Sequence, residues 1–169
     1  MSKYSHQEKA IGKGAPSRFL LQEKIIGTSA QSRFSRQEKV IGKEAQRKLQ
    51  QSKVAVVGVG ALGTIVANLL ARSGVKELIL VDRDIVEESN LSRQILFTEK
   101  DVGKSKAHCA KEKLEQINSQ IKIIAKAIHL KSENIVDLKE HQPNTIIDCT
   151  DNLKTRFLIN DYCKKEKIP

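Results

Sequence analysis

Two kinds of residue that suit a bound nucleotide follow each other early in the chain. Gly58, Gly60 and Gly63 have the spacing G-x-G-x-x-G, and Asp82 lies 24 residues after the first glycine. Glycines at this spacing permit a tight turn whose backbone amides approach phosphate oxygens at a helix N-terminus. An acid at the end of the next strand can accept hydrogen bonds from ribose hydroxyls. The pattern indicates a nucleotide site rather than a merely structural turn.

The elements that must position these residues are also present. Residues 53–57 form a β-branched run that predicts a buried strand, and residues 77–81 predict a second one. Between them, residues 64–73 carry apolar side chains at helical spacing, and Gly74 is suited to end that helix. The glycine motif therefore lies in a β-α-β unit, the structural context in which such a motif indicates nucleotide binding.

The residues beyond Asp82 differ from those that a redox dinucleotide requires. Asn90 and Arg93 form an Asn-x-x-Arg sequence shortly after the predicted strand. Arginine and amide donors meet the charge of a triphosphate, which a nicotinamide site does not contain. ATP is therefore the expected ligand, and an NAD-dependent oxidoreductase stays open as the alternative.

Motifs in four parts of the chain resemble those of the adenylyltransferases related to ubiquitin-activating enzymes, of the HesA, MoeB and ThiF type. The motif D-x-D-x-V-x-x-S-N-L-x-R-Q occupies residues 82–94. It is accompanied by R-F-S-R-Q at 33–37, V-G-K-S-K-A at 102–107 and D-C-T-D-N at 148–152, in the family's order. The resemblance covers about residues 33–169. Bacterial members of this family activate the sulfur-carrier proteins of molybdopterin and thiamine synthesis.

The resemblance implies an ATP-dependent reaction of a carboxylate. The C-terminal carboxylate of a ubiquitin-like sulfur carrier would attack the α-phosphate of ATP, and acyl adenylate and pyrophosphate would form. Such a reaction needs alignment and charge neutralisation rather than a protein nucleophile. The implied cofactors are ATP and Mg²⁺, the implied assembly is a homodimer, and zinc is implied only beyond residue 169. A related tRNA-modifying enzyme and a non-catalytic nucleotide-binding fragment stay open as alternatives.

The resemblance also gives roles to individual residues. Lys106 would reach the α- or β-phosphate, with Lys104 as the alternative lysine. Asp151 would hold the Mg²⁺ ion that bridges the phosphates. Arg36 would clamp the triphosphate from the neighbouring subunit, and with Arg93, Lys106 and Asp151 it forms the expected catalytic set. The expected nucleotide-binding residues are Gly58, Gly60, Ala61, Gly63, Asp82, Asp84, Ser89, Asn90, Arg93, Lys106, Asp151 and Asn152.

Several of these residues have a second interpretation. Asp84 would serve either the metal or its own loop, and Asn152 either the nucleotide or the N-cap of a helix. Ser89 would support its loop as well as the nucleotide, whereas Gln94 would support only the loop. Cys149 lies in an apolar strand, where a core residue is expected rather than a nucleophile.

The whole chain predicts a doubly wound, Rossmann-like α/β fold with a mostly parallel sheet. Further strands are expected at 121–127 and 144–149. Helices are expected at 43–51, from residue 101 or 103 to 118, at 132–138, and at 152–165 with Phe157, Leu158 and Tyr162 facing inward. The family pattern places another strand and the acceptor-binding half after Pro169, so the fold is expected to be truncated after its fourth strand. We expect the 169-residue polypeptide alone to bind ATP weakly, to act little on a carrier and to self-associate.

Composition agrees with a globular protein of the reducing cytoplasm. Charged residues make up 30% of the 169 residues, no apolar run reaches membrane-spanning length, and the three cysteines form no C-x-x-C pair. The net charge of +10 is uneven, since residues 1–50 contain 11 Lys/Arg against 4 Glu. Aromatic residues are only 4%, and the absence of a recognised module argues against nucleic-acid binding.

The first fifty residues contain a fifteen-residue repeat. The sequence Gln-Glu-Lys recurs at Gln7, Gln22 and Gln37, but only the third copy is preceded by R-F-S-R. We interpret the first two copies as spare products of tandem duplication and expect them to be mobile. The predicted organisation is a repetitive basic arm at 1–32 and an incomplete ATP-binding adenylyltransferase domain at 33–169.

Overall fold

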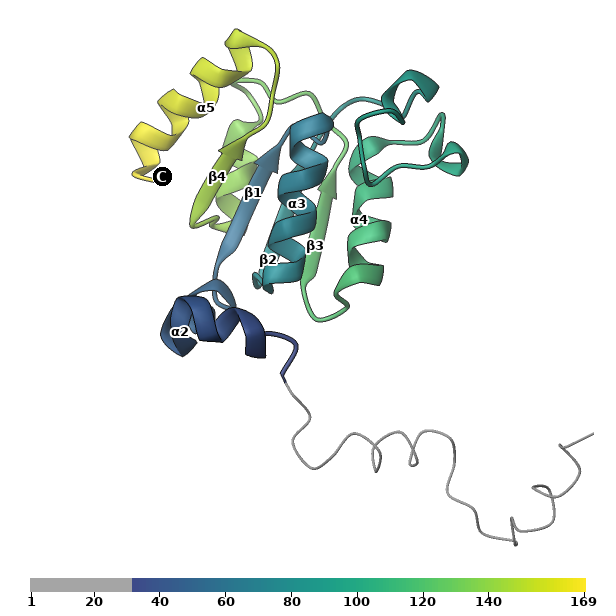
Figure 1. Cartoon of the computed structure of the whole chain (residues 1–169). Coiled ribbons are helices and arrows are strands. Elements are labelled where there is room, and N and C mark those ends of the chain that lie inside the picture. Colours follow the sequence, from purple (N-terminus) through teal and green to yellow (C-terminus); the bar gives the residue numbers. More distant parts are fainter. Residues whose placement is uncertain (1–31) are drawn as a thin grey trace, which may run out of the picture. The chain divides into compact units, whose positions relative to one another are not determined.

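Four parallel strands form the central sheet in the computed structural model, which describes residues 32–169. The strands are β1 (Lys53–Val57), β2 (Glu77–Val81), β3 (Lys122–Lys126) and β4 (Thr145–Asp148). Their order in the sheet is β3-β2-β1-β4 (Figure 1). Val57 pairs with Val81 on one side and with Asp148 on the other, so three strands end together at one edge. The predicted fold class and parallel sheet are confirmed.

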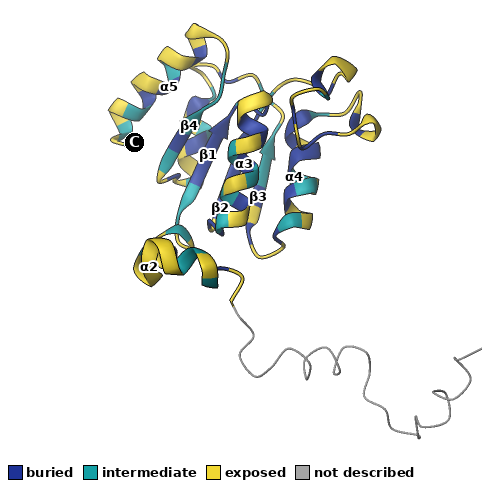
Figure 2. Cartoon of the chain, viewed as in Figure 1, coloured by how far each residue is buried: buried dark blue, intermediate teal, exposed yellow. Residues whose placement is uncertain are grey.

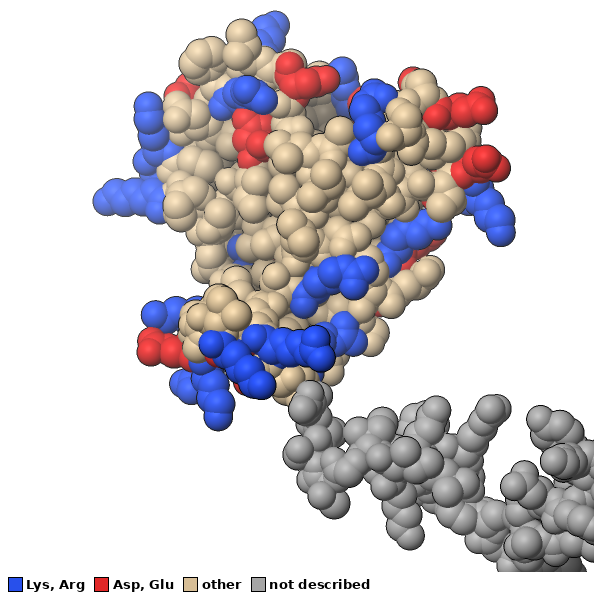
Figure 3. All heavy atoms as spheres, viewed as in Figure 1, with Lys and Arg blue, Asp and Glu red and all other residues tan. Residues whose placement is uncertain are grey.

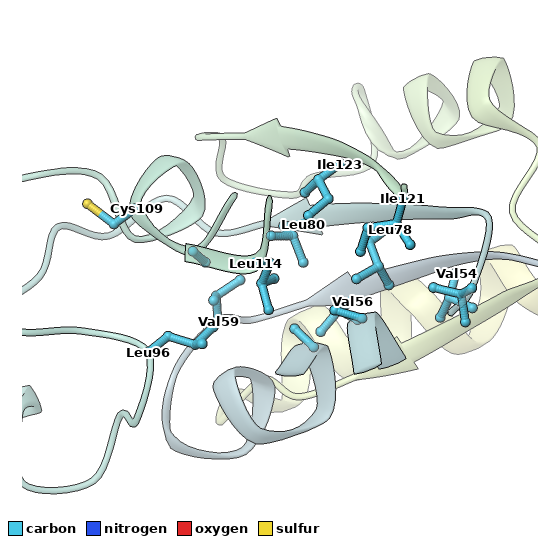
Figure 4. Close-up of a cluster of buried hydrophobic side chains, with 14 of the residues drawn as sticks. Val54, Val56, Val59, Leu78, Leu80, Leu96, Cys109, Leu114, Ile121 and Ile123 are labelled. Atoms are coloured by element: carbon cyan, nitrogen blue, oxygen red, sulfur yellow. The ribbon is translucent and has the colours of Figure 1, made fainter. Parts of the chain in front are cut away.

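Helices cover both faces of this sheet. One core lies under α3 (Ala61–Ser73) and α4 (Lys106–Ile117), and the other under α5 (Leu153–Glu166) and the 3₁₀ helix η3 (Ile135–His141). Alternate strand residues serve the two cores: Leu78 and Leu80 belong to the first (Figure 4), and Ile79 to the second. All five residues of β2 are buried (Figure 2). A strand buried on both faces reads as a continuous apolar run, which is why β2 is predictable.

The helix before β1 begins earlier than predicted. It is α2 (Ser35–Leu49), not residues 43–51, and it is interrupted at Gly42, whose φ is +83°. Gln46, 1% exposed, anchors it by donating from Nε2 to the Ser73 carbonyl at 3.0 Å. Because the anchor is an amide rather than an apolar stripe, periodicity did not reveal it.

Other predicted boundaries were also wrong. The helix expected from residue 101 or 103 begins at Lys106, because Glu99–Asp101 forms a separate 3₁₀ turn, η2, and Gly103 has a φ of +83°. The helix expected at 132–138 is η3, displaced by three residues. Phe157 does not face inward, since it is 65% exposed, whereas Tyr162 is buried.

Residues 36–169 form one compact unit, and the structural description below concerns that unit. The first two repeat copies, and with them the expected mobile arm, lie outside the described residues. Within the described part, no helix is long and apolar enough to cross a membrane.

Candidate nucleotide site

A cavity of about 690 Å³ opens at the edge where β1, β2 and β4 end. Ligands of doubly wound folds bind at this edge. The predicted residues that line it are Gly58, Gly60, Ala61, Asp82, Asp84, Asn90, Arg93, Lys106, Asp151 and Asn152. Gly63, Ser89 and Arg36 are not among its lining residues. The chain thus brings together most of the predicted site from segments far apart in sequence.

The three glycines of the turn differ in the space that the structure leaves for a side chain at each position. Gly58 has a φ of +89°, and a Cβ on it would lie 2.7 Å from the Cys149 carbonyl oxygen. A Cβ on Gly63 would lie 1.9 Å from the Gly58 carbonyl oxygen, so this residue packs α3 against the turn instead of lining the cavity. A Cβ on Gly60 would meet nothing nearer than Gln94 Nε2 at 3.8 Å. The protein's own packing therefore leaves space at Gly60, beside the start of α3.

Asp82 holds the turn and the loop after β2 together. Its Oδ2 accepts a hydrogen bond from the Val59 amide at 2.6 Å, and its Oδ1 accepts one from the Asp84 amide at 2.8 Å. Asp82 therefore has a structural role in holding its loop. This role does not exclude ligand binding, because each carboxylate oxygen has a second lone pair.

Lys106 is the buried lysine of the cavity, with 7% of its surface exposed, whereas Lys104 is exposed. Its Nζ lies 3.5 Å from Asp84 Oδ2, and its backbone amide donates to the Asp84 carbonyl at 2.9 Å. Asp84 therefore has a structural role, since it places Lys106 and anchors its own loop. A buried ammonium with one long carboxylate contact is well suited to a further anionic partner.

The loop around the 3₁₀ helix η1 (Glu88–Asn90) is held by its own polar groups. Asn90 accepts from the Glu87 amide at 3.2 Å, and Arg93 Nη1 donates to the Ser89 carbonyl at 2.8 Å. Ser89 thus supports the loop. Gln94 lines the cavity at 4% exposure, and its Oε1 is buried without a partner in the described part of the chain. A buried unpaired acceptor is costly and calls for a partner.

Asp151 and Asn152 follow β4 and have different surroundings. Asn152 Oδ1 accepts from the Thr155 amide at 2.9 Å, so it is the N-cap of α5. Asp151 is exposed, and among residues 32–169 its carboxylate has no hydrogen bond or ion pair. No three His, Cys, Asp or Glu side chains of that range gather into a metal cluster. Asp151 fits Mg²⁺ shared with phosphates, because this ion commonly takes one or two carboxylates and completes its shell from phosphates and water.

Among the cavity residues to which sequence reasoning assigned no role are Arg83, His129 and Arg156. Arg83 Nη1 contacts His129 Nδ1 across the ends of β2 and β3. Arg156 follows the N-cap Asn152 by one helical turn, and that spacing was the available signal.

Cys149 also lines the cavity, but burial, with a smaller effect of the Asp148 charge, raises the pKa of its thiol. The expected non-nucleophilic character of Cys149 agrees with that direction.

A doubly wound sheet with a glycine turn, an acid after β2 and a polar cavity at its carboxyl edge defines the class of nucleotide-binding α/β domains. The ThiF family model matches residues 34–169, so the chain belongs to the ThiF family. The expected adenylyltransferase family is confirmed by the named relatives that follow.

Two bacterial relatives are sulfur carrier protein ThiS adenylyltransferases. That of Bacillus subtilis (strain 168) is 43% identical over 124 residues, which are 72% of this chain and 37% of the relative. That of Escherichia coli (strain K12) is 41% identical over 122 residues, 72% of this chain and 48% of the relative. The chain thus spans less than half the length of these curated relatives.

Solved structures show the same fold. E. coli tRNA N6-threonylcarbamoyladenosine dehydratase, TcdA, in complex with ATP has a TM-score of 0.77 at 28% identity, over 81% of this chain and 56% of that one. E. coli MccB with ATP has a TM-score of 0.74 at 31% identity, over 85% and 44%.

Proposed function

We propose that the protein uses ATP to adenylate the C-terminal carboxylate of a ubiquitin-like sulfur carrier. The observation that carries the proposal is one cavity in which the glycine turn, Asp82, Lys106 and Asp151 meet. The sulfur-carrier substrate is favoured by 43% identity to a ThiS adenylyltransferase, against 28% to the tRNA enzyme. Because the chain spans part of these relatives, the activity is proposed for the protein to which this domain belongs.

ATP binding would use the cavity from its β2 side to its β4 side. Asp82 would accept from the ribose hydroxyls with the lone pairs that the turn leaves free. The space beside Gly60 would let phosphates approach the amides at the start of α3, where the helix dipole favours negative charge. The side chain of Gln94, which lines the cavity, would lie beside the bound nucleotide.

The chemical step would be a displacement at phosphorus. A carboxylate oxygen of the carrier bonds to the α-phosphorus, the bond from that phosphorus to the bridging oxygen of the β-phosphate breaks, and pyrophosphate leaves. Lys106 and Arg93 would neutralise the charge, and burial of Lys106 strengthens its effect. Asp151 would hold Mg²⁺, which would supply further positive charge at the phosphates. The other site residues of this chain would bind ATP and align it with the carrier carboxylate.

A homodimer belongs to the proposal. Arg36 is exposed on α2 and does not line its own cavity, so it would serve the cavity of a second copy. Leu62, Ile65 and Leu69 form an exposed apolar stripe on α3, at 56%, 42% and 59% exposure. The face over α3 is largely uncharged in Figure 3. Leu62 also lines the cavity, so a copy seated on this stripe would border the site.

A cytoplasmic location is proposed from the three free thiols.

Activation of a group on tRNA is the second candidate. It is favoured by the TM-score of 0.77 with the TcdA structure and by the cationic surface of α2. Lys and Arg side chains gather over that helix in Figure 3. They are Arg36, Lys39, Lys43, Arg47 and Lys48. Such a surface suits a polyanion as well as solvent.

Pyrophosphate exchange tests the proposal. In the protein to which this domain belongs, we expect exchange of labelled pyrophosphate into ATP to rise when a carrier ending in Gly-Gly is added, above the level of the matched Asp151→Asn variant. Removal of the carrier's last glycine should abolish the rise. Stimulation by tRNA instead of the carrier would establish the second candidate, and no stimulation by either would contradict an adenylation role.

A further inference from the structure

The loop that carries Asp151 is held by four hydrogen bonds and one ion pair that together form a closed circuit. Asp148 Oδ1 accepts from the Thr150 amide at 2.8 Å and from the Thr150 hydroxyl at 2.7 Å. The Thr150 carbonyl in turn accepts from Arg156 Nε at 3.2 Å and from Nη2 at 2.7 Å. Arg156 Nε lies 3.7 Å from Asp148 Oδ2, which closes the circuit.

This circuit fixes the peptide plane in front of Asp151. The Thr150 carbonyl belongs to the peptide group that joins Thr150 to Asp151, and that group is planar. Two donors from one rigid guanidinium hold the carbonyl in direction as well as distance. On the other side of Asp151, Asn152 is held as the N-cap of α5. The backbone of Asp151 is therefore fixed from both sides, while its own carboxylate has no partner within residues 32–169.

We propose that Arg156 is a positioning residue that aims Asp151 at the metal-bound phosphates through the Thr150 carbonyl. The inference rests on the proposed function, because it requires ATP with Mg²⁺ in the cavity. Two of the five guanidinium N–H groups of Arg156 donate to the Thr150 carbonyl, and its charge lies beside Asp148, so its role in this proposal is to hold the loop rather than to bind phosphate. Residues that orient metal ligands in this way typically change metal affinity by about 10–100-fold when they are removed.

A competing account makes Arg156 a direct phosphate ligand, because it is exposed and lines the cavity. Substitution by lysine separates the two accounts. Arg156→Lys keeps the positive charge but loses the planar fork that holds the Thr150 carbonyl. A charge that attracts phosphates survives this change, whereas the fixed peptide plane does not.

The experiment measures ATP affinity of the whole chain by calorimetry, with Mg²⁺ and with EDTA. The parent should gain affinity from Mg²⁺, and Arg156→Ala should lose about tenfold of that gain while its Mg²⁺-free affinity is unchanged. Arg156→Lys should behave like Arg156→Ala. Asp148→Asn weakens the same circuit but leaves the Arg156 side chain in place. This variant should also lower the gain in ATP affinity from Mg²⁺. The matched control is Lys154→Ala, an exposed cation of α5 that does not line the cavity.

The outcomes separate this inference from the proposed function. Loss of Mg²⁺-free affinity in Arg156→Ala, restored by Arg156→Lys, would make Arg156 a phosphate ligand and overturn the inference. A full Mg²⁺ gain in folded Arg156→Ala and Asp148→Asn would also overturn it, as would a parent that binds ATP without any Mg²⁺ gain. None of these outcomes contradicts the binding of ATP in the cavity. A parent that binds no ATP would contradict the proposed function first.

Discussion

The Asp82 carboxylate accepts a 2.6 Å hydrogen bond from the backbone amide of Val59. This contact joins the two halves of the nucleotide fingerprint, since Val59 lies inside the glycine turn and Asp82 follows the next strand. The same carboxylate holds the Asp84 amide, and Asp84 places Lys106. The proposed ribose ligand is therefore also the residue that keeps the phosphate side of the cavity in shape.

Substitution of Asp82 should reduce both binding and stability. Asp82→Ala removes two backbone hydrogen bonds and the proposed ribose contact, so we expect ATP binding to weaken by roughly 1.5–3 kcal/mol. The melting temperature should also fall, because the Val59 and Asp84 amides lose their acceptor. Glu140→Ala, at an exposed acid of η3, is the control for loss of one negative charge. Calorimetry and thermal unfolding would detect both effects, and unchanged ATP affinity in Asp82→Ala would place the ribose elsewhere.

The second and third glycines of the turn should respond differently to alanine. Gly63→Ala puts a Cβ 1.9 Å from the Gly58 carbonyl oxygen, so strain should lower the free energy of unfolding by about 1–3 kcal/mol. Gly60→Ala meets no protein atom within 3.8 Å, so the fold should survive while phosphates lose their closest approach. Each variant serves as the other's control in denaturant titration and ATP binding. Full ATP affinity in Gly60→Ala would show that phosphates do not approach there.

Arg36 should act on the cavity of a partner copy. We expect Arg36→Ala to depress turnover, whereas Arg47→Ala, at an exposed arginine of the same helix, should not. Arg36→Ala mixed with Asp151→Asn should recover part of the activity, because a mixed dimer then contains one site with both residues. The measurement is exchange of labelled pyrophosphate into ATP by each variant alone and by their mixture. Absence of recovery in a verified mixed dimer would mean that Arg36 serves its own chain or none.

Local sequence patterns predicted the elements that carry the site. The buried run of β2, the turn and Asp82 are contiguous features, and the strand order that brings β4 beside β1 is that of a doubly wound sheet, the predicted fold class. Gln94 was expected only to support its loop, because its burial depends on its position beside the glycine turn, which is far from it in sequence. Arg156 was missed although its partners, the Thr150 carbonyl and the Asp148 carboxylate, are close in sequence, because residue types do not show that the first turn of α5 folds back onto that loop. Phe157 was misplaced because α5 buries only a narrow stripe.

Helix starts were the least predictable part. The polar residues between Glu99 and Ser105 are as compatible with a helix as with a turn, and the left-handed backbone at Gly103 decided between them. Similarly, the loop around Asp82 could be read as a ligand site or as a hydrogen-bonded turn. The structure contains that turn and leaves lone pairs of the carboxylate for a ligand. Residue types alone did not reveal that one carboxylate can hold the turn and still keep lone pairs for a ligand.

The most direct test of the account is a comparison of two nucleotides on the same protein. Titration with ATP and Mg²⁺, and separately with NAD, would be followed by calorimetry under identical conditions. We expect ATP to bind more tightly than NAD, because Lys106 and Arg93 provide positive charge for a triphosphate beside Asp151. Tighter binding of NAD would contradict the central claim and would assign the cavity to a redox dinucleotide.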